Sequence, residues 1–345
     1  MLIDRIRKNI ETGKKLSEDL TQVQNVNGYN ASLENTEKKP LLHVENLKQY
    51  FKVSSSYTVK AVDNVSFNIY PGETYGLVGE SGSGKSTIGR SVIRLYNPTS
   101  GSIEFDGRNI SRKMSLQDRN YLRTNMQMIF QDPMACLNPR KKVGEIIGEG
   151  LDIHHLYKTR AEREEKIQAI LKKVGLSPEH IDRYPHQFSG GQRQRVGIAR
   201  ALILNPKLII ADECISALDV SIQAQVVNLL KDIQAETGTA YLFIAHDLSM
   251  VKYISDRIGV LHLGHMLETG TTEEIFARPV HPYTRSLMSA IPRPNPVVEK
   301  NRKIESYNYA ESGINYDLGY LHHVEGTHYV LCTDEEYDNW LKETV

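Results

Sequence analysis

The sequence has few of the features that mark secreted, metal-clustered or membrane-spanning chains. Its three cysteines, Cys136, Cys214 and Cys332, are far apart and form no Cys-x-x-Cys pair. We therefore expect neither a disulfide framework nor a cysteine-rich metal site, and a reducing compartment fits best. No apolar stretch approaches the ~20 residues that a membrane-spanning helix needs. Residues 1–12 carry charges where a signal peptide would have its apolar region. The chain is expected to stay in the cytoplasm, held at any membrane by another subunit.

Net charge is also absent. The 42 Lys and Arg side chains balance the 42 Asp and Glu side chains, so no whole-chain field favours nucleic acid or anionic lipid. Hydrophobic residues make up 40% of the chain and charged residues 24%, which is typical of a folded globular protein. We predict no nucleic-acid partner and no direct membrane span.

Predicted strands and helices alternate after a polar N-terminal segment. Residues 1–40 are rich in Lys, Glu and Asn, and we interpret them as a solvated extension in preference to a docking element. Apolar patterns predict strands at 42–44, 61–70, 74–78, 208–211 and 241–245, a hairpin at 101–110, and helices at 87–95 and within about 134–187. This order predicts an α/β fold whose mostly parallel sheet is interrupted by a helical insertion.

A phosphate-binding loop follows the predicted strand at 74–78. Residues 79–86, Gly-Glu-Ser-Gly-Ser-Gly-Lys-Ser, match the P-loop pattern between a strand and a helix. Small residues let backbone N–H groups turn toward phosphates, and the helix start adds about half a positive charge. Lys85 is predicted to reach the β- and γ-phosphates, and Ser86 to ligate Mg²⁺. The predicted nucleotide-binding residues here are Gly79, Glu80, Ser81, Gly82, Ser83, Gly84, Lys85, Ser86 and Thr87.

Two adjacent acids end the apolar strand at 208–211. A parallel strand delivers such residues to the carboxyl edge of the sheet, where ligands of α/β proteins bind. Asp212 is predicted to hold Mg²⁺, directly or through water. Glu213 is predicted to act as general base toward the attacking water, a role worth typically 10²–10⁴-fold in rate. A solvated loop is the alternative for two adjacent carboxylates, but the apolar run before them disfavours it.

A second glycine-rich helix start lies between these two halves. Ser189, Gly190, Gly191 and Gln192 precede a helical run, and such a helix start can bind an anion. The Ser-Gly-Gly-Gln sequence resembles the signature of the ATP-binding cassette (ABC) ATPases. The resemblance implies that ATP and Mg²⁺ are the ligands. It also implies that residues 189–192 contact the γ-phosphate bound to the P-loop of an opposite subunit.

Three further residues match the ABC pattern in order. Gln131 resembles the glutamine, between the sheet and the helical lobe, that senses Mg²⁺ and the γ-phosphate. Asp219, in Ser-Ala-Leu-Asp, resembles the loop that crosses the dimer interface, and His246 resembles the switch histidine that hydrogen-bonds the γ-phosphate. The resemblance therefore implies a catalytic set of Glu213, His246 and Gln131, and a Mg²⁺ set of Ser86, Gln131 and Asp212.

One aromatic residue upstream of the P-loop normally stacks on adenine in this family. We choose Tyr50 first, Phe51 second and Tyr57 third, and a core aromatic is the alternative for each. The chain departs from the family pattern at Phe188, where Leu is usual, and at Cys214, where Pro is frequent. Both replacements can fill the same space, and we interpret Cys214 as a buried, inert thiol.

Three stretches point to one branch of the family. Gln131 to Ile147, the His-Pro-Tyr-Thr-Arg motif at 281–285, and Gly326 to Cys332 resemble the oligopeptide/dipeptide importer ATPases. The resemblance implies a second ABC ATPase subunit as a heterodimer partner, two transmembrane permease subunits, an extracytoplasmic peptide-binding protein, and a peripheral position on the cytoplasmic face of the plasma membrane. An importer of nickel or another solute is the close alternative, and a soluble, non-transport ABC ATPase is a more distant one.

The resemblance also implies a division of the chain. Residues 1–40 would form the polar extension, 41–266 the nucleotide-binding domain, and 267–345 an oligopeptide-transporter-type C-terminal region. The expected fold class is a P-loop NTPase of the ABC type, with a mostly parallel sheet core, an antiparallel β subdomain, and a helical lobe at about 134–190.

Overall fold

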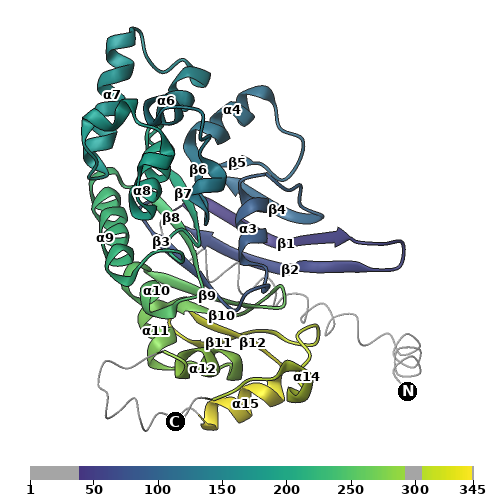
Figure 1. The fold of residues 1–345 in the computed structure, drawn as a ribbon. Coiled ribbons are helices and arrows are strands. Elements are labelled where there is room, and N and C mark those ends of the chain that lie inside the picture. The colour runs from purple at the N-terminus through teal and green to yellow at the C-terminus, as the bar shows by residue number, and fades with distance from the viewer. Residues whose placement is uncertain (1–38, 292–304, 344–345) are drawn as a thin grey trace.

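A computed structural model describes residues 39–291 and 305–343 of the chain. The predicted N-terminal extension lies almost entirely outside the described residues. Within them, an eight-stranded sheet has the order β11-β12-β10-β9-β3-β8-β7-β6, and a four-stranded sheet has the order β2-β1-β4-β5 (Figure 1).

The centre of the large sheet is parallel. β3 pairs in parallel with β8 and β9, and β7 with β6 and β8. β3, β7 and β8 are buried at every residue, as expected for parallel strands covered on both faces. The strands of this sheet are β3 (Thr74–Val78), β6 (Met126–Ile129), β7 (Leu208–Asp212), β8 (Ala240–Ala245), β9 (Arg257–His262), β10 (His265–Thr271), β11 (Tyr320–Glu325) and β12 (His328–Cys332).

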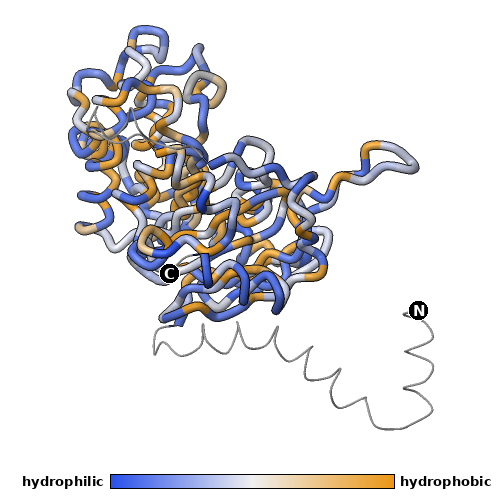
Figure 2. Tube along the Cα trace, turned by 90° about the horizontal axis from the view of Figure 1, so that it is seen from below, coloured by the Kyte–Doolittle hydropathy of each residue, from blue (hydrophilic) through white to orange (hydrophobic). Residues whose placement is uncertain are grey.

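The smaller sheet is antiparallel, as expected for the β subdomain. Its strands are β1 (Leu42–Lys52), β2 (Thr58–Ile69), β4 (Ser100–Phe105) and β5 (Arg108–Asn109). β4 and β5 form the hairpin expected at 101–110. The β1–β2 hairpin projects from the body of the molecule (Figures 1 and 2) and exposes Val53 and Tyr57 at its tip.

The helices cover the sheet and form the insertion. α7 shows how the sequence sets their bounds: Thr159 caps its start by accepting from the Glu162 N–H, and Gly175 follows its end with a φ of 74°. The α-helices are α3 (Lys85–Val92), α4 (Leu116–Asn125), α5 (Pro133–Cys136), α6 (Val143–His154), α7 (Arg160–Lys173), α8 (Gly190–Leu202), α9 (Val220–Thr237), α10 (Leu248–Ile254), α11 (Thr272–Ala277), α12 (Pro282–Ser289), α14 (Tyr309–Ser312) and α15 (Asp334–Glu343).

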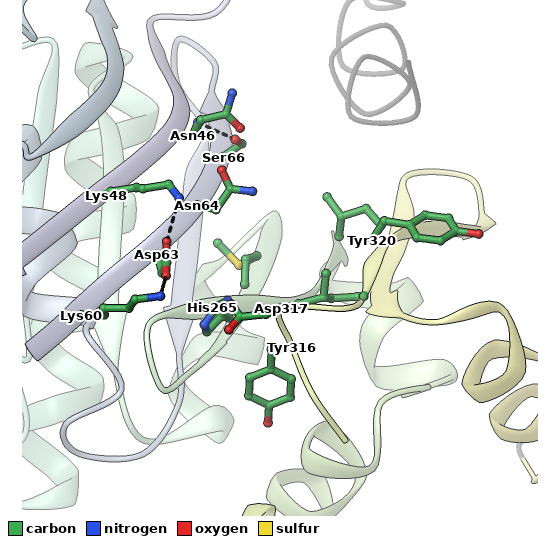
Figure 3. Close-up of a pocket in the computed structure, with 14 residues that line it drawn as sticks. Asn46, Lys48, Lys60, Asp63, Asn64, Ser66, His265, Tyr316, Asp317 and Tyr320 are labelled. Atoms are coloured by element: carbon green, nitrogen blue, oxygen red, sulfur yellow. Dashed lines mark hydrogen bonds and ion pairs between the residues drawn. The ribbon is translucent and has the colours of Figure 1, made fainter. Parts of the chain in front are cut away.

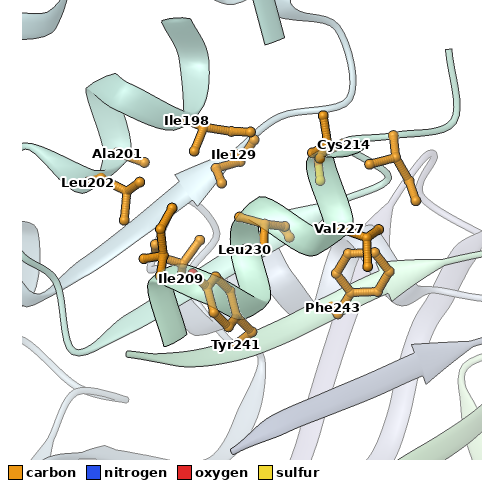
Figure 4. Close-up of a cluster of buried hydrophobic side chains, with 14 of the residues drawn as sticks. Ile129, Ile198, Ala201, Leu202, Ile209, Cys214, Val227, Leu230, Tyr241 and Phe243 are labelled. Carbon is orange, nitrogen blue, oxygen red and sulfur yellow. The ribbon is translucent and has the colours of Figure 1, made fainter. Parts of the chain in front are cut away.

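The core lies on both faces of the large sheet because successive side chains of a strand point to opposite faces. Ile209, Tyr241 and Phe243 join a cluster with α8 and α9, and Figure 4 shows them with Val227 and Leu230 of α9. The intervening Ile210 and Leu242, among others, join a second cluster with α3 and the antiparallel sheet.

Cys214 is 2% exposed in the first cluster, and burial raises the pKa of its thiol to about 12, so the thiol stays protonated and unreactive.

The C-terminal region continues the central sheet. The predicted boundary after residue 266 falls inside β10, which pairs with β9 on one side and with β12 on the other. β11 and β12 then form the edge of the same sheet. Residues 267–343, where described, are therefore bound to the cassette through strand pairing, with α12, α14 and α15 packed beneath it (Figure 1).

Candidate functional site

The P-loop runs from the end of β3 to the start of α3. Gly79, Gly82 and Gly84 have φ values of 149°, 84° and 107°, a region that favours glycine. Space also requires glycine at two of these positions. A Cβ at Gly79 would lie 2.0 Å from the Leu261 carbonyl oxygen, and one at Gly84 would lie 2.3 Å from that of Ala61. The loop is thus enclosed by β2 and by the end of β9.

Lys85 lies inside this loop. Its Nζ donates to the carbonyl oxygens of Gly79 at 2.8 Å and Glu80 at 2.7 Å. The residue is 3% exposed, and burial lowers the pKa of its ammonium group, against the opposing effect of Glu213 and Asp212. The positive charge is therefore held close to the place where phosphate is expected.

Ser86 and Asp212 meet although they are 126 residues apart. The Ser86 hydroxyl donates to Asp212 Oδ1 at 2.6 Å. Asp212 is 2% exposed, and burial raises the pKa of its carboxyl, while the bond from Ser86 acts in the opposite direction. A hydroxyl and a carboxylate in contact are two oxygen ligands of the kind that Mg²⁺ prefers, so the residues present fit this ion.

Glu213, Gln131 and His246 form a polar group next to that pair. Gln131 Nε2 donates to Glu213 Oε2 at 2.8 Å, and His246 Nδ1 lies 4.0 Å from Glu213 Oε1. Glu213 has a φ of 46°, an uncommon value for a non-glycine residue, and its N–H donates to the Ile244 carbonyl at 2.9 Å. The Glu213 carboxylate thus lies next to Gln131 and His246, the other two residues of the predicted catalytic set.

The signature residues lie at the start of α8. Ser189 caps the helix, and its side chain and that of Gln192 each accept from the other residue's backbone N–H. A Cβ at Gly190 would meet nothing within 4 Å, whereas one at Gly191 would lie 2.8 Å from Ile222 of α9. Asp219 begins α9 without a side-chain capping bond. None of the hydrogen bonds of the Ser189 and Gln192 side chains reaches the P-loop within the described part of the chain.

Tyr50 and Phe51, the first and second choices for stacking on adenine, have different neighbours in the structure. The Tyr50 hydroxyl donates to Asp63 at 2.6 Å. Gln49, its neighbour on the other face, approaches Ser91 of α3 at 3.5 Å, and Phe51 packs edge-on to Tyr96 with 5.3 Å between ring centroids. Phe51, our second choice, is therefore on the side of β1 that faces α3, the helix that directly follows the P-loop.

A cavity of about 360 Å³ lies apart from these residues, between β1, β2 and residues 316–321 (Figure 3). Asp63, His265 and Asp317 line it, with possible ligand atoms within 4.8 Å of one another. However, Lys48 and Lys60 pair with Asp63 at 3.1 and 3.0 Å. Although burial acts against it, hydrogen bonds from Tyr50 and both lysines hold the pKa of Asp63 at about 2. Two ammonium groups at this distance oppose a divalent cation, so we assign no metal to the cavity.

Sequence reasoning missed two contributors to the site. The Gly264 N–H, in the turn between β9 and β10, donates to the Ser83 carbonyl at 2.9 Å. Arg90 Nη2 lies 3.9 Å from Asp212 Oδ2. The position of Arg90 four residues after Ser86 on α3 is a signal that could have identified it, because residues i and i+4 share a helix face. The turn carries no comparable signal.

Comparison with known families separates the chain into two matched parts. The ABC transporter family model matches residues 62–216, and the model for the oligopeptide/dipeptide transporter C-terminal region matches residues 267–315. Among the described residues, no helix combines the length and apolarity needed to cross a membrane.

Curated relatives match along most of the chain. It is 56% identical to the oligopeptide transport ATP-binding protein OppF of Bacillus subtilis, over 88% of this chain and 98% of that protein. The corresponding values are 54%, 89% and 99% for OppF of Streptococcus mutans, and 51%, 89% and 98% for the dipeptide transport ATP-binding protein DppF of Lactococcus lactis.

Solved structures share the cassette. CbiO1 of Clostridium perfringens, part of the ABC transporter complex cbiONQ, aligns with a TM-score of 0.61 at 29% identity, over 70% of this chain and 92% of that one. The ATP-binding cassette MJ0796, a dimer in a post-hydrolysis state bound to ADP and Pi, aligns with a TM-score of 0.62 at 29% identity, over 67% of this chain and 98% of that one.

Proposed function

The chain belongs to the ABC transporter family and is the ATP-binding and ATP-hydrolysing subunit of a peptide importer; on this premise we propose how its residues perform hydrolysis and which subunits complete it. The observation that carries the proposal is the convergence of Lys85, Ser86, Asp212, Glu213 and Gln131 at the carboxyl edge of one sheet. The site contains the buried ammonium group of Lys85, which can bind phosphate, and the oxygen ligands of Ser86 and Asp212. The Glu213 carboxylate is not needed as a ligand.

Each of these groups has a separate task in hydrolysis. The P-loop N–H groups and Lys85 hold the phosphates, and Ser86 and Asp212 would hold Mg²⁺, which would supply positive charge against the phosphate oxygens. Glu213 accepts a proton from the attacking water, and Gln131 orients the Glu213 carboxylate through its 2.8 Å hydrogen bond. His246 is close enough to Glu213 to complete the polar group around the γ-phosphate.

We propose that a second cassette completes the site. Gly190 opens onto free space at a helix start, as an anion-binding position requires, and MJ0796, which shares the cassette fold, forms a dimer. A chain whose signature serves another chain's P-loop has an incomplete site when alone. A heterodimer with a second ABC ATPase is our preferred arrangement.

The specific ATPase activity of the isolated chain is therefore expected to depend on its concentration. At low concentration it should bind MgATP but hydrolyse it weakly, and activity should rise with protein concentration or on addition of the second ATPase subunit. Steady-state phosphate release over a dilution series measures this. Full activity that is independent of concentration would contradict the requirement for a second cassette.

We propose that Phe51 stacks on adenine in place of Tyr50. Replacing Phe51 by Ala should raise the Kd for ATP about tenfold, because base–aromatic stacking is worth about 1–3 kcal/mol. Tyr50→Phe, which removes only the hydroxyl bound to Asp63, is the matched control and should leave the Kd within about twofold. Titration with a fluorescent ATP analogue measures both. The opposite ranking, tested with Tyr50→Ala beside Phe51→Ala, would restore Tyr50 as the stacking residue.

The transported solute and the membrane partners are the remaining part of the proposal. Relatives named for oligopeptide and dipeptide transport support peptide in preference to nickel. We propose two permease subunits that hold the chain at the cytoplasmic face of the plasma membrane, and an extracytoplasmic peptide-binding protein. Vesicles reconstituted with these subunits should take up labelled peptide in an ATP-dependent manner. Uptake of nickel without peptide uptake would favour the alternative.

A further inference from the structure

Tyr283 connects the C-terminal region directly to the P-loop. The Glu80 backbone N–H donates to the Tyr283 hydroxyl oxygen at 2.8 Å, across 203 residues of sequence. Tyr283 belongs to the His-Pro-Tyr motif in the first turn of α12 and is 1% exposed. The motif identified the family branch, but neither the sequence nor the hydrolysis mechanism assigns this side chain a role.

The Tyr283 ring is held firmly in place. It packs on His262 of β9 with 4.2 Å between ring centroids, and Tyr307 meets it edge-on at 5.6 Å. Its backbone N–H donates to His281 Nδ1 at 3.0 Å. Burial raises the pKa of the Tyr283 hydroxyl well above its usual range, so the group stays neutral and remains an acceptor for Glu80.

The start of α12 is in turn tied to two strands of the sheet. The Glu268 carboxylate, on β10, accepts from the backbone N–H groups of Val280 at 2.8 Å and His281 at 3.0 Å. It also contacts His328 Nε2, on β12, at 2.7 Å, and both of these side chains are fully buried. Glu268 thus links the start of α12, which carries Tyr283, to both β10 and β12.

The backbone of Glu80 makes two hydrogen bonds, one through its carbonyl oxygen and one through its N–H. Its carbonyl oxygen accepts from Lys85 Nζ at 2.7 Å, and its N–H is bound by Tyr283. If Lys85 turned to the phosphates it would leave this carbonyl. The N–H bound by Tyr283 belongs to the preceding peptide unit, between Gly79 and Glu80, and its bond does not depend on that movement.

We propose that Tyr283 is a positioning residue for the P-loop, and that the affinity for ATP therefore depends on the docked C-terminal region. The Tyr283 hydroxyl fixes the first peptide units of the loop while Lys85 exchanges its carbonyl partners for phosphate oxygens. Without that hydroxyl, the free P-loop samples other orientations, and ATP binding must select one of them. The inference rests on the ATP-binding function of the loop.

The test is Tyr283→Phe, which removes only the hydroxyl. The Kd for MgATP is expected to rise about three- to tenfold, the equivalent of one hydrogen bond, and KM should follow while kcat stays within about twofold, because Glu213 is untouched. Tyr307→Phe is the matched control. It removes a hydroxyl from the same aromatic cluster, one that contacts Tyr316 at 3.0 Å, and should leave the Kd within about twofold.

A second measurement reads the proposed contact directly. Hydrogen exchange of a peptide covering residues 79–84, without nucleotide, should be faster in Tyr283→Phe than in the wild type and unchanged in Tyr307→Phe. Equal Kd values and equal exchange in all three proteins, with similar melting temperatures, would overturn the proposal and leave Tyr283 as a packing residue. Failure of the wild type to bind MgATP would instead refute the proposed function itself.

Discussion

Glu213→Gln is expected to reduce ATP turnover by about 10²–10⁴-fold while leaving the affinity for MgATP nearly unchanged. The reduction is the typical contribution of general-base catalysis, since an amide cannot take the proton of the attacking water. Affinity persists because Lys85, Ser86 and Asp212 keep their contacts. The amide oxygen can still accept from Gln131, and the replacement is as compatible with the φ of 46° as glutamate is.

The measurement is single-turnover and steady-state hydrolysis together with a nucleotide titration. Glu236→Gln makes the same chemical change in an exposed ion pair with Lys173 on the surface, and it should leave turnover within about twofold of the wild type. If Glu213→Gln itself retains activity within about threefold, Glu213 is not the base. If, as proposed, two cassettes close around ATP and hydrolysis reopens them, the variant should also accumulate as an ATP-bound dimer in gel filtration.

Lys85→Ala is expected to weaken ATP binding itself by about a hundredfold. Lys85 is a buried cation aimed at the phosphates, and a charge-assisted hydrogen bond contributes about 1.5–3 kcal/mol. Loss of two such bonds at the lower value amounts to about 3 kcal/mol, or two decades in Kd. The carbonyl oxygens of Gly79 and Glu80 also lose their ammonium donor, so the free loop becomes less ordered.

Equilibrium titration with MgATP measures this loss. Lys207→Ala is the control for the removal of one positive charge. Lys207 pairs with Asp106 on the surface at 2.6 Å and precedes β7, at the end of that strand opposite Asp212. Its replacement should leave the Kd unchanged because of this position. It should also cost little stability, because surface ion pairs contribute about 0–1 kcal/mol. A Kd for Lys85→Ala within about threefold of the wild type would show that the backbone N–H groups bind phosphate without the ammonium.

The comparison of the two variants separates binding from chemistry. Glu213→Gln should change kcat and preserve Kd, whereas Lys85→Ala should change Kd and thereby kcat/KM. Tyr283→Phe should also raise the Kd, but by less than Lys85→Ala, because Tyr283 contacts the loop and not the phosphates. The three variants together therefore distinguish the reacting group, the phosphate ligand and the residue that positions the loop.

Much of the nucleotide site could be predicted from the sequence because its parts are contiguous motifs. The run at 79–86 between a strand and a helix can adopt few backbone paths, and its glycines have the positive φ values that the motif requires. The apolar run at 208–211 is a buried parallel strand, which delivers Asp212 to the same sheet edge as the P-loop. Strand periodicity likewise predicted the α/β class and the β4–β5 hairpin.

The choice between Tyr50 and Phe51 for adenine stacking shows where such prediction ends. Tyr50 and Phe51 are neighbours, so they occupy opposite faces of β1, and sequence pattern does not tell which face meets α3. The register decides it, and the pairing of β1 with β2 shifts between Gln49 and Tyr50. In the folded protein the Tyr50 hydroxyl contacts Asp63, whereas Phe51 packs against Tyr96.

The sequence by itself therefore identified the motifs and the family of this protein: the phosphate-loop pattern, the two acids at the end of β7, and the signature. The tertiary structure alone decided what supports that chemistry. It added β11 and β12 to the edge of the central sheet, joined Glu268 to His328, and brought Tyr283 onto the N–H of Glu80. The physical reason is the range of the interactions. A motif acts through backbone geometry within a few residues, whereas strand partners and hydrogen bonds across 60 or 203 residues exist only once the chain has folded.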